Sequence, residues 1–157
     1  MTEALALLAT LLLGLFAGSL LTEAFLLVPY FRSLSHGDFN RLHHEFGPRL
    51  YRYYAPLTIS ATILPLVSAA VTMIAHSQGA PFAGLAAALG LAILAIYFLY
   101  FRRANLALSE KRFNEPALAK ELARWAAVHN IRTGLAIGAF AASVLAALQA
   151  MGATASV

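Results

Sequence analysis

The sequence predicts an all-α integral-membrane protein: a four-helix up-down bundle with both termini outside, whose second and fourth helices extend on the cytoplasmic side. Three observations predict it, namely the composition, four long apolar runs and the positions of the charges. The 157-residue chain is 61% hydrophobic and only 11% charged, whereas a soluble domain carries about 25% charged residues. This composition excludes an ordinary soluble domain.

Four apolar runs give the predicted crossings, at about residues 4–28, 55–76, 82–101 and 126–151. Each reaches about 20 residues, the length that a helix needs to cross a hydrocarbon layer about 30 Å thick. The only charged residue before the first run is Glu3, so the run lacks the basic region of a signal peptide. It is interpreted as a retained helix. We expect residues 1–157 to form a single membrane domain.

The charges predict the orientation. All eleven lysines and arginines fall in two blocks, residues 32–52 and 102–132, which separate run one from run two and run three from run four. Because basic loops stay in the cytoplasm, both blocks should be cytoplasmic and both termini outside. The expected location is the inner (cytoplasmic) membrane of a bacterium. The net charge of +4 is then a consequence of topology, and no nucleic-acid partner is expected.

Both basic blocks carry helix signals, which predict that helices two and four project about two turns beyond the membrane. Ser35 and Asp38 supply capping chemistry before the second helix, and Asn114 caps a fourth helix with Pro116 in its first turn. Bends are expected near Pro48 and Pro56. Apolar residues recur at helical spacing at Phe39, Leu42, Phe46, Leu50 and Tyr53, and one helix face carries Leu118, Leu122, Trp125, His129, Arg132 and Ala136.

Two pairs of glycines predict close packing of the crossings. Gly14 and Gly18 are spaced by four residues in the first run, and Gly134 and Gly138 have the same spacing in the fourth. Small residues at this spacing let membrane helices approach closely.

Polar residues inside or beside the apolar runs are the candidate site. Glu23 lies in an apolar stretch, where a carboxylate is costly and faces the bundle interior or a cavity. It is a candidate metal ligand, proton acceptor or substrate anchor, and the alternative is a structural pair with Arg132. The other candidates share its predicted depth at the cytoplasmic end of the bundle: His43, His44, Asn105, Trp125, His129 and Arg132.

The chain has no cysteine, so thiolate metal sites and disulfides are excluded. One carboxylate and two imidazoles, from Glu23, His43 and His129, are a donor set suited to iron, copper or zinc. Two imidazoles suit a haem such as haem b. Trp125 and His44 are the expected cofactor-contacting residues. A plain structural role, with Arg132 reaching the interface as a topology charge and Trp125 as an interfacial aromatic, stays open.

Three segments resemble the anthrone-oxygenase-like family of small four-helix membrane proteins: LTEAFLLVPYFRSL (21–34), FNRLHHEFGPRLYRYYAPL (39–57) and FNEPALAKELARWAAVHNIRT (113–133). The most specific part is the Asn-x-Pro segment followed by Trp125, His129 or Asn130, and Arg132. Named members of that family are implicated in oxidising anthrones to anthraquinones with dioxygen. The resemblance implies an oxidoreductase, and makes Glu23 and the double histidine, His43 and His44, its candidate site residues.

The leading hypothesis is an oxygenase that takes a lipophilic, aromatic substrate from the bilayer. Glu23 or His43 would remove an acidic proton, and Arg132 with Asn105 would stabilise the oxyanion before dioxygen reacts. The first alternative is a non-enzymatic subunit or assembly factor in a larger membrane complex or a homo-oligomer. The second is a small proton-coupled transporter, although the chain shows no pair of broken helices.

Overall fold

The computed structural model describes residues 2–154, and this part of the chain forms helices joined by short turns, with no strand. Four helical stretches are long and apolar enough to cross a membrane: Thr2–Ser33, His36–Ile74, Ala80–Ser109 and Glu115–Gly152. The individual elements are α1 (Thr2–Thr22), η1 (Glu23–Leu27), α2 (Val28–Ser33), α3 (His36–Ile74), α4 (Ala80–Ile96), η2 (Tyr97–Phe101), α5 (Arg102–Ser109) and α6 (Glu115–Thr154).

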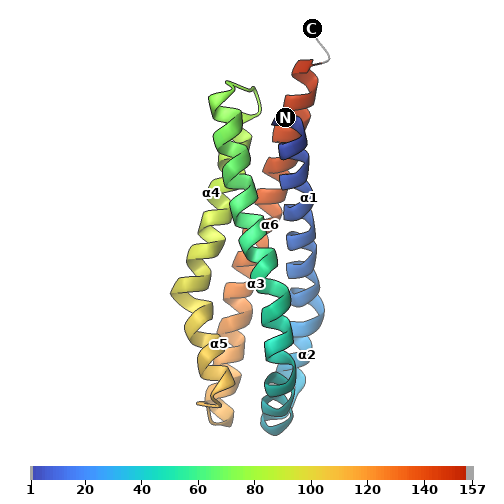
Figure 1. Ribbon diagram of the computed structural model, residues 1–157. Coiled ribbons are helices and arrows are strands. Elements are labelled where there is room, and N and C mark those ends of the chain that lie inside the picture. The colour runs from blue at the N-terminus through green and yellow to red at the C-terminus, as the bar shows by residue number, and fades with distance from the viewer. Residues whose placement is uncertain (1, 155–157) are drawn as a thin grey trace.

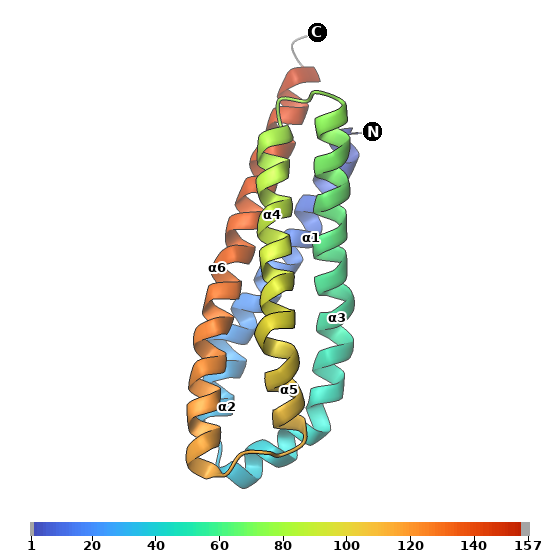
Figure 2. The ribbon, with the colours of Figure 1, turned by 90° about the vertical axis from the view of Figure 1, so that its left-hand side faces the viewer.

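The four long helices lie side by side in an elongated bundle (Figure 1). The connections from α2 to α3 and from α5 to α6 lie at one end, and the turn between α3 and α4 lies at the other (Figure 2). The two basic blocks include these first two connections, so they gather at one end of the bundle.

The outer surface of the bundle is apolar along the four candidate spans. Within the most apolar window of each long helix, between 28% and 39% of the residues are buried. Leucine and isoleucine side chains that point outward are largely uncovered, as at Leu11 (64% exposed) and Ile74 (80% exposed). An apolar surface of this extent needs a lipid or protein cover. Together with the four candidate spans, it indicates an integral membrane protein in contact with lipid.

Two π-helical segments, which the sequence pattern did not predict, follow α1 and α4. In η1 the backbone N–H of Val28 bonds to the carbonyl of Glu23, and in η2 that of Arg102 bonds to the carbonyl of Tyr97. Each bond closes a wider turn than an α-helix has, which re-aims the following side chains. The order helix, π segment, short helix and long helix occurs twice, so the two halves of the chain share one layout.

Both predicted helix starts are confirmed. The Ser35 hydroxyl accepts the backbone N–H of Asp38 at 3.2 Å, so it caps α3. The side-chain oxygen of Asn114 accepts the N–H of Ala117 at 3.1 Å, so it caps α6. From these caps α3 and α6 run without interruption into the apolar crossings, as predicted for helices two and four, and α3 stays helical through its internal prolines.

The predicted inward face of α6 is confirmed, because its six residues, Leu118, Leu122, Trp125, His129, Arg132 and Ala136, are all buried. The apolar stripe of α3 behaves differently: Phe39 is buried, but Phe46 and Tyr53 are exposed.

The close packing predicted for the two glycine pairs is found at only some of the glycines. A Cβ atom on Gly14 would lie 3.0 Å from the Phe140 ring, which is the predicted close packing.

Gly18 and Gly134 do not fit the packing prediction, because no described atom lies within 4 Å of a Cβ placed on either. In contrast, Gly79, just before α4, was not predicted to pack closely, yet a Cβ placed on it would come nearer to a neighbouring atom than at any other described glycine. A Cβ there would come within 2.5 Å of the backbone oxygen of Ala146 in α6. This contact joins α4 and α6 at the end of the bundle that carries the α3–α4 turn.

Candidate functional site

A buried polar cluster joins α6 to the end of α1. Its members are Glu23, the first residue of η1, and His129 and Arg132 on α6, with exposed fractions of 5%, 0% and 9%. Arg132 donates from a terminal nitrogen to Oε2 of Glu23 at 3.1 Å, which makes a buried ion pair. The pairing of Glu23 with Arg132 that the sequence raised as an alternative is therefore present, and a role of the same pair in a site stays a proposal.

The hydrogen bonds of His129 assign its tautomer. Nε2 lies 3.0 Å from the carbonyl oxygen of Leu20, which can only accept, so Nε2 carries the proton. Nδ1 lies 2.9 Å from a terminal nitrogen of Arg132, which can only donate, so Nδ1 is the acceptor. The imidazole is thus neutral, both nitrogens are occupied, and the ring ties Arg132 to the backbone of α1.

Arg132 also reaches the second π segment. Its guanidinium carbon lies 4.4 Å from the centre of the Phe101 ring, at the end of η2, in a cation–π contact. Its Nε has no hydrogen-bond partner among the described residues. Glu23 begins η1 and Phe101 ends η2, so this one side chain contacts both π segments from α6.

Trp125 completes the cluster one turn before His129. The two rings stack at 5.1 Å with 9° between their planes, and the indole also meets Phe101 edge-on at 5.3 Å. The indole N–H donates to Oδ1 of Asn105 on α5 at 3.0 Å. Asn105 therefore supports Trp125 from the side, and its place beside the cluster agrees with the predicted convergence.

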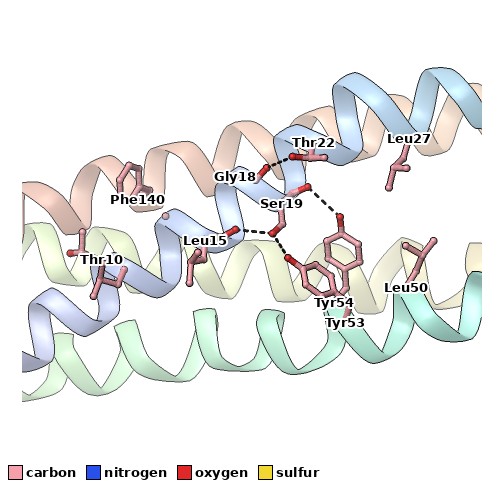
Figure 3. Close-up of a pocket in the computed structure, with 12 residues that line it drawn as sticks. Thr10, Leu15, Gly18, Ser19, Thr22, Leu27, Leu50, Tyr53, Tyr54 and Phe140 are labelled. Carbon is pink, nitrogen blue, oxygen red and sulfur yellow. Dashed lines mark hydrogen bonds between the residues drawn. The ribbon is translucent and has the colours of Figure 1, made fainter.

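A groove of about 890 Å³ opens beside this cluster, between α1 and α3 (Figure 3). Exposed Leu11 and Leu15 lie on its α1 side, Tyr53 lies on its α3 side, and Phe140 of α6 also lines it. None of its lining residues is charged. Its volume falls in the range of small-molecule sites, about 300–1,000 Å³. Gly18, which among the described residues has no packing partner within 4 Å of a Cβ placed on it, is one of the lining residues.

Tyr54 connects the groove to the buried ion pair. Its ring lines the groove, and its hydroxyl donates to the carbonyl oxygen of Ser19 at 3.2 Å (Figure 3). The same hydroxyl lies near the Glu23 carboxylate and the Arg132 guanidinium. A molecule in the groove would thus be separated from the ion pair by one phenol group.

The two candidate histidines of α3 do not join this cluster. His43 is half-buried, stacks on Phe39 at 5.4 Å, and leaves its Nδ1 without a partner among the described residues. His44 is exposed. The prediction that His43 converges with Glu23 on one site is not supported, because its ring faces Phe39 and Gly47 of its own helix.

The predicted metal ligands do not assemble. Within residues 2–154, no group of three or more His, Cys, Asp or Glu side chains is placed to hold a metal ion. Glu23 and His129 do meet, with 3.7 Å between Oε2 and Nδ1, but Arg132 occupies that side of the imidazole. With both ring nitrogens of His129 engaged, the residues present do not fit the predicted iron or copper site, nor axial ligation of haem b by His43 and His129.

The sequence did not indicate the groove residues Ser19, Tyr53 and Tyr54, because tyrosines at the start of an apolar run, as at 51, 53 and 54, are typical of an interfacial aromatic belt. The available signal was the pair of adjacent tyrosines at the start of an apolar run.

No family model, curated protein or solved structure matches this chain. The resemblance to the anthrone-oxygenase-like family therefore stays a prediction.

Proposed function

We propose that the protein is an integral-membrane oxidoreductase of the oxygenase type, which acts on a lipophilic, aromatic substrate held in the groove between α1 and α3. One observation carries the proposal: the uncharged groove borders Tyr54, and Tyr54 borders a buried carboxylate and guanidinium. A lipophilic molecule would enter from the bilayer through the exposed side of the groove and meet proton-transfer groups at its inner wall.

The orientation belongs to the same proposal. The two basic blocks gather at the end with the α2–α3 and α5–α6 connections, and the positive-inside rule makes that end cytoplasmic. The helices then alternate up and down, both termini lie outside, and Glu23 lies toward the cytoplasmic side. The basic blocks are also what supports the inner membrane of a bacterium as the location.

The proposed reaction needs no group beyond dioxygen. Glu23 accepts a proton from an acidic CH₂ group of the substrate, relayed by the Tyr54 hydroxyl when its O–H turns from Ser19 to the carboxylate. The carbanion adds dioxygen, and the resulting peroxide anion takes the proton back from Glu23 to give a hydroperoxide. The hydroperoxide loses water and leaves a carbonyl, so that CH₂ and O₂ become C=O and H₂O. Arg132 neutralises Glu23 while the carboxylate is ionised, and its charge offsets that of the substrate carbanion once Glu23 is protonated.

The test is dioxygen consumption and anthraquinone formation from anthrone, with the purified protein in nanodiscs. A general base typically contributes 10²–10⁴-fold, so Glu23→Gln and Tyr54→Phe should each lower the rate above empty nanodiscs about 100-fold or more. Gly18→Leu, which fills the groove, should do the same. Gly134→Leu is the matched control on an open face outside the groove and should retain the full rate. A wild-type rate equal to that of empty nanodiscs would refute the proposal.

A second candidate, a non-enzymatic subunit or assembly factor of a larger membrane complex, is favoured by a different observation. The Glu23 carboxylate is already neutralised by Arg132, and His129 fastens that pair to the backbone. Such a closed arrangement suits a structural lock between α1 and α6. Co-purification with one fixed partner, undiminished in Tyr54→Phe and Gly18→Leu, would favour this candidate.

A further inference from the structure

We propose that the groove between α1 and α3 selects neutral lipophiles that carry a hydrogen-bond donor, such as a hydroxyl group, and binds the matching ether or carbonyl compound more weakly. The inference rests on the proposed function only in taking the groove as the ligand site. It requires no turnover, and it follows from the direction of every hydroxyl proton in the groove wall.

The three aliphatic hydroxyls of the groove all donate to helix backbone. Ser19 donates to the carbonyl of Leu15 at 2.8 Å, and Thr22 donates to that of Gly18 at 3.0 Å. The Thr10 proton is directed at the carbonyls of Ala6 and Ser143, at 2.9 and 3.1 Å. A hydroxyl has one proton and two lone pairs, so these groups keep only acceptor capacity for a ligand.

The hydroxyl protons of the two phenol groups are also already used in hydrogen bonds. Ser19 Oγ lies 2.8 Å from the Tyr53 hydroxyl, and because the Ser19 proton already goes to Leu15, Tyr53 is the donor. The Tyr54 hydroxyl donates to the carbonyl of Ser19 (Figure 3). The oxygens of Tyr53 and Tyr54 therefore retain lone pairs, and no proton, for a molecule in the groove.

The groove thus offers acceptors and no free donor, and none of its lining residues carries a charge. A hydroxyl ligand gains a hydrogen bond, whereas an ether or ketone gains none and leaves its own acceptor unpaired in an apolar surrounding. A carboxylate or phosphate would find no cation. The selected class is a neutral alcohol or phenol with an apolar body that lies beside Gly18.

In the proposed reaction this selectivity would favour a substrate that carries a phenol group in addition to the CH₂ group that is oxidised. The product would also bind more weakly, because the reaction creates a carbonyl group to which the groove offers no hydrogen-bond donor.

The test compares 1-naphthol with 1-methoxynaphthalene, which have the same ring system and differ by methylation of the oxygen. Binding to the protein in nanodiscs is measured by titration calorimetry, with the signal of empty nanodiscs subtracted. One hydrogen bond corresponds to about tenfold in affinity, so 1-naphthol should bind about tenfold more tightly. Equal affinities for the wild-type protein would overturn the inference.

Two variants locate the effect. The double variant Ser19→Ala/Tyr53→Phe removes two acceptors and should reduce the preference to less than about threefold, and an unchanged preference would overturn the assignment. Gly18→Leu should abolish binding of both probes, and Gly134→Leu should not. If the hydroxyl preference is found and anthrone is not oxidised, the proposed reaction fails and this inference stands. If anthrone is oxidised without the preference, the inference alone fails.

Discussion

Replacing Arg132 by methionine is expected to destabilise the bundle strongly, because three contacts depend on its guanidinium. These are the ion pair with Glu23 at 3.1 Å, the hydrogen bond to His129 at 2.9 Å and the cation–π contact with Phe101 at 4.4 Å. Glu23 would remain 5% exposed with no compensating charge. Removing one partner of a buried pair costs about 3–5 kcal/mol, and Arg132→Met should fall in this range.

Glu23→Gln leaves the charge of Arg132 unpaired. The cost should be about 3 kcal/mol, at the lower end of the same range, because the amide oxygen still accepts a hydrogen bond from Arg132. The double variant Glu23→Gln/Arg132→Met buries no charge. Replacing a buried pair by neutral groups is often without net cost, but the double variant still lacks the hydrogen bond to His129 and the contact with Phe101. It should therefore lie within about 3 kcal/mol of the wild-type protein. The two substitutions should therefore be coupled by at least about 3 kcal/mol.

The chain provides its own probe, because its single tryptophan, Trp125, stacks on His129 within the cluster. Unfolding in mixed micelles of increasing dodecyl sulfate content can be followed by its fluorescence. Arg103→Met is the control, an exposed arginine on α5 that should change stability by less than about 0.5 kcal/mol. A double variant as unstable as the sum of the single variants would refute the ion-pair reasoning.

Three further predictions concern the frame around the site. Gly79→Ala should destabilise by about 1–3 kcal/mol, because the new methyl group meets the fixed backbone oxygen of Ala146; thermal unfolding in detergent measures this. Asn105→Leu should cost about 1–3 kcal/mol and shift the emission of Trp125, whose indole N–H loses its acceptor; an unshifted spectrum would contradict this. Ser35→Ala should cost about 1 kcal/mol at the start of α3, seen as faster amide exchange in its first turn.

The crossings and the inward face of α6 could be predicted because each depends on local spacing. Four apolar runs of sufficient length and a repeat of buried positions from Leu118 to Ala136 need no knowledge of neighbours. The caps at Ser35 and Asn114 are equally local. These features follow from residues within a few positions of one another along the chain.

The π segments and the groove could not be predicted in this way. An extra residue in a turn leaves the apolar composition unchanged, so η1 and η2 have no signature in the hydropathy pattern. The groove depends on how α1 and α3 diverge, which decides that Gly18 faces open space while Gly14, one turn earlier, meets Phe140. The prediction for His43 relied on its depth along the bundle, and depth does not set the direction of a side chain.

The ion pair and the groove also allow the two proposed functions to be separated in one protein. If Glu23 is a proton acceptor, the double variant Glu23→Gln/Arg132→Met should recover most of the stability and none of the anthrone oxidation, because the amide cannot accept the proton. If the pair is a structural lock alone, the same variant should recover stability and partner binding together. Stability is measured in both cases, so a loss of activity in the double variant cannot be attributed to unfolding.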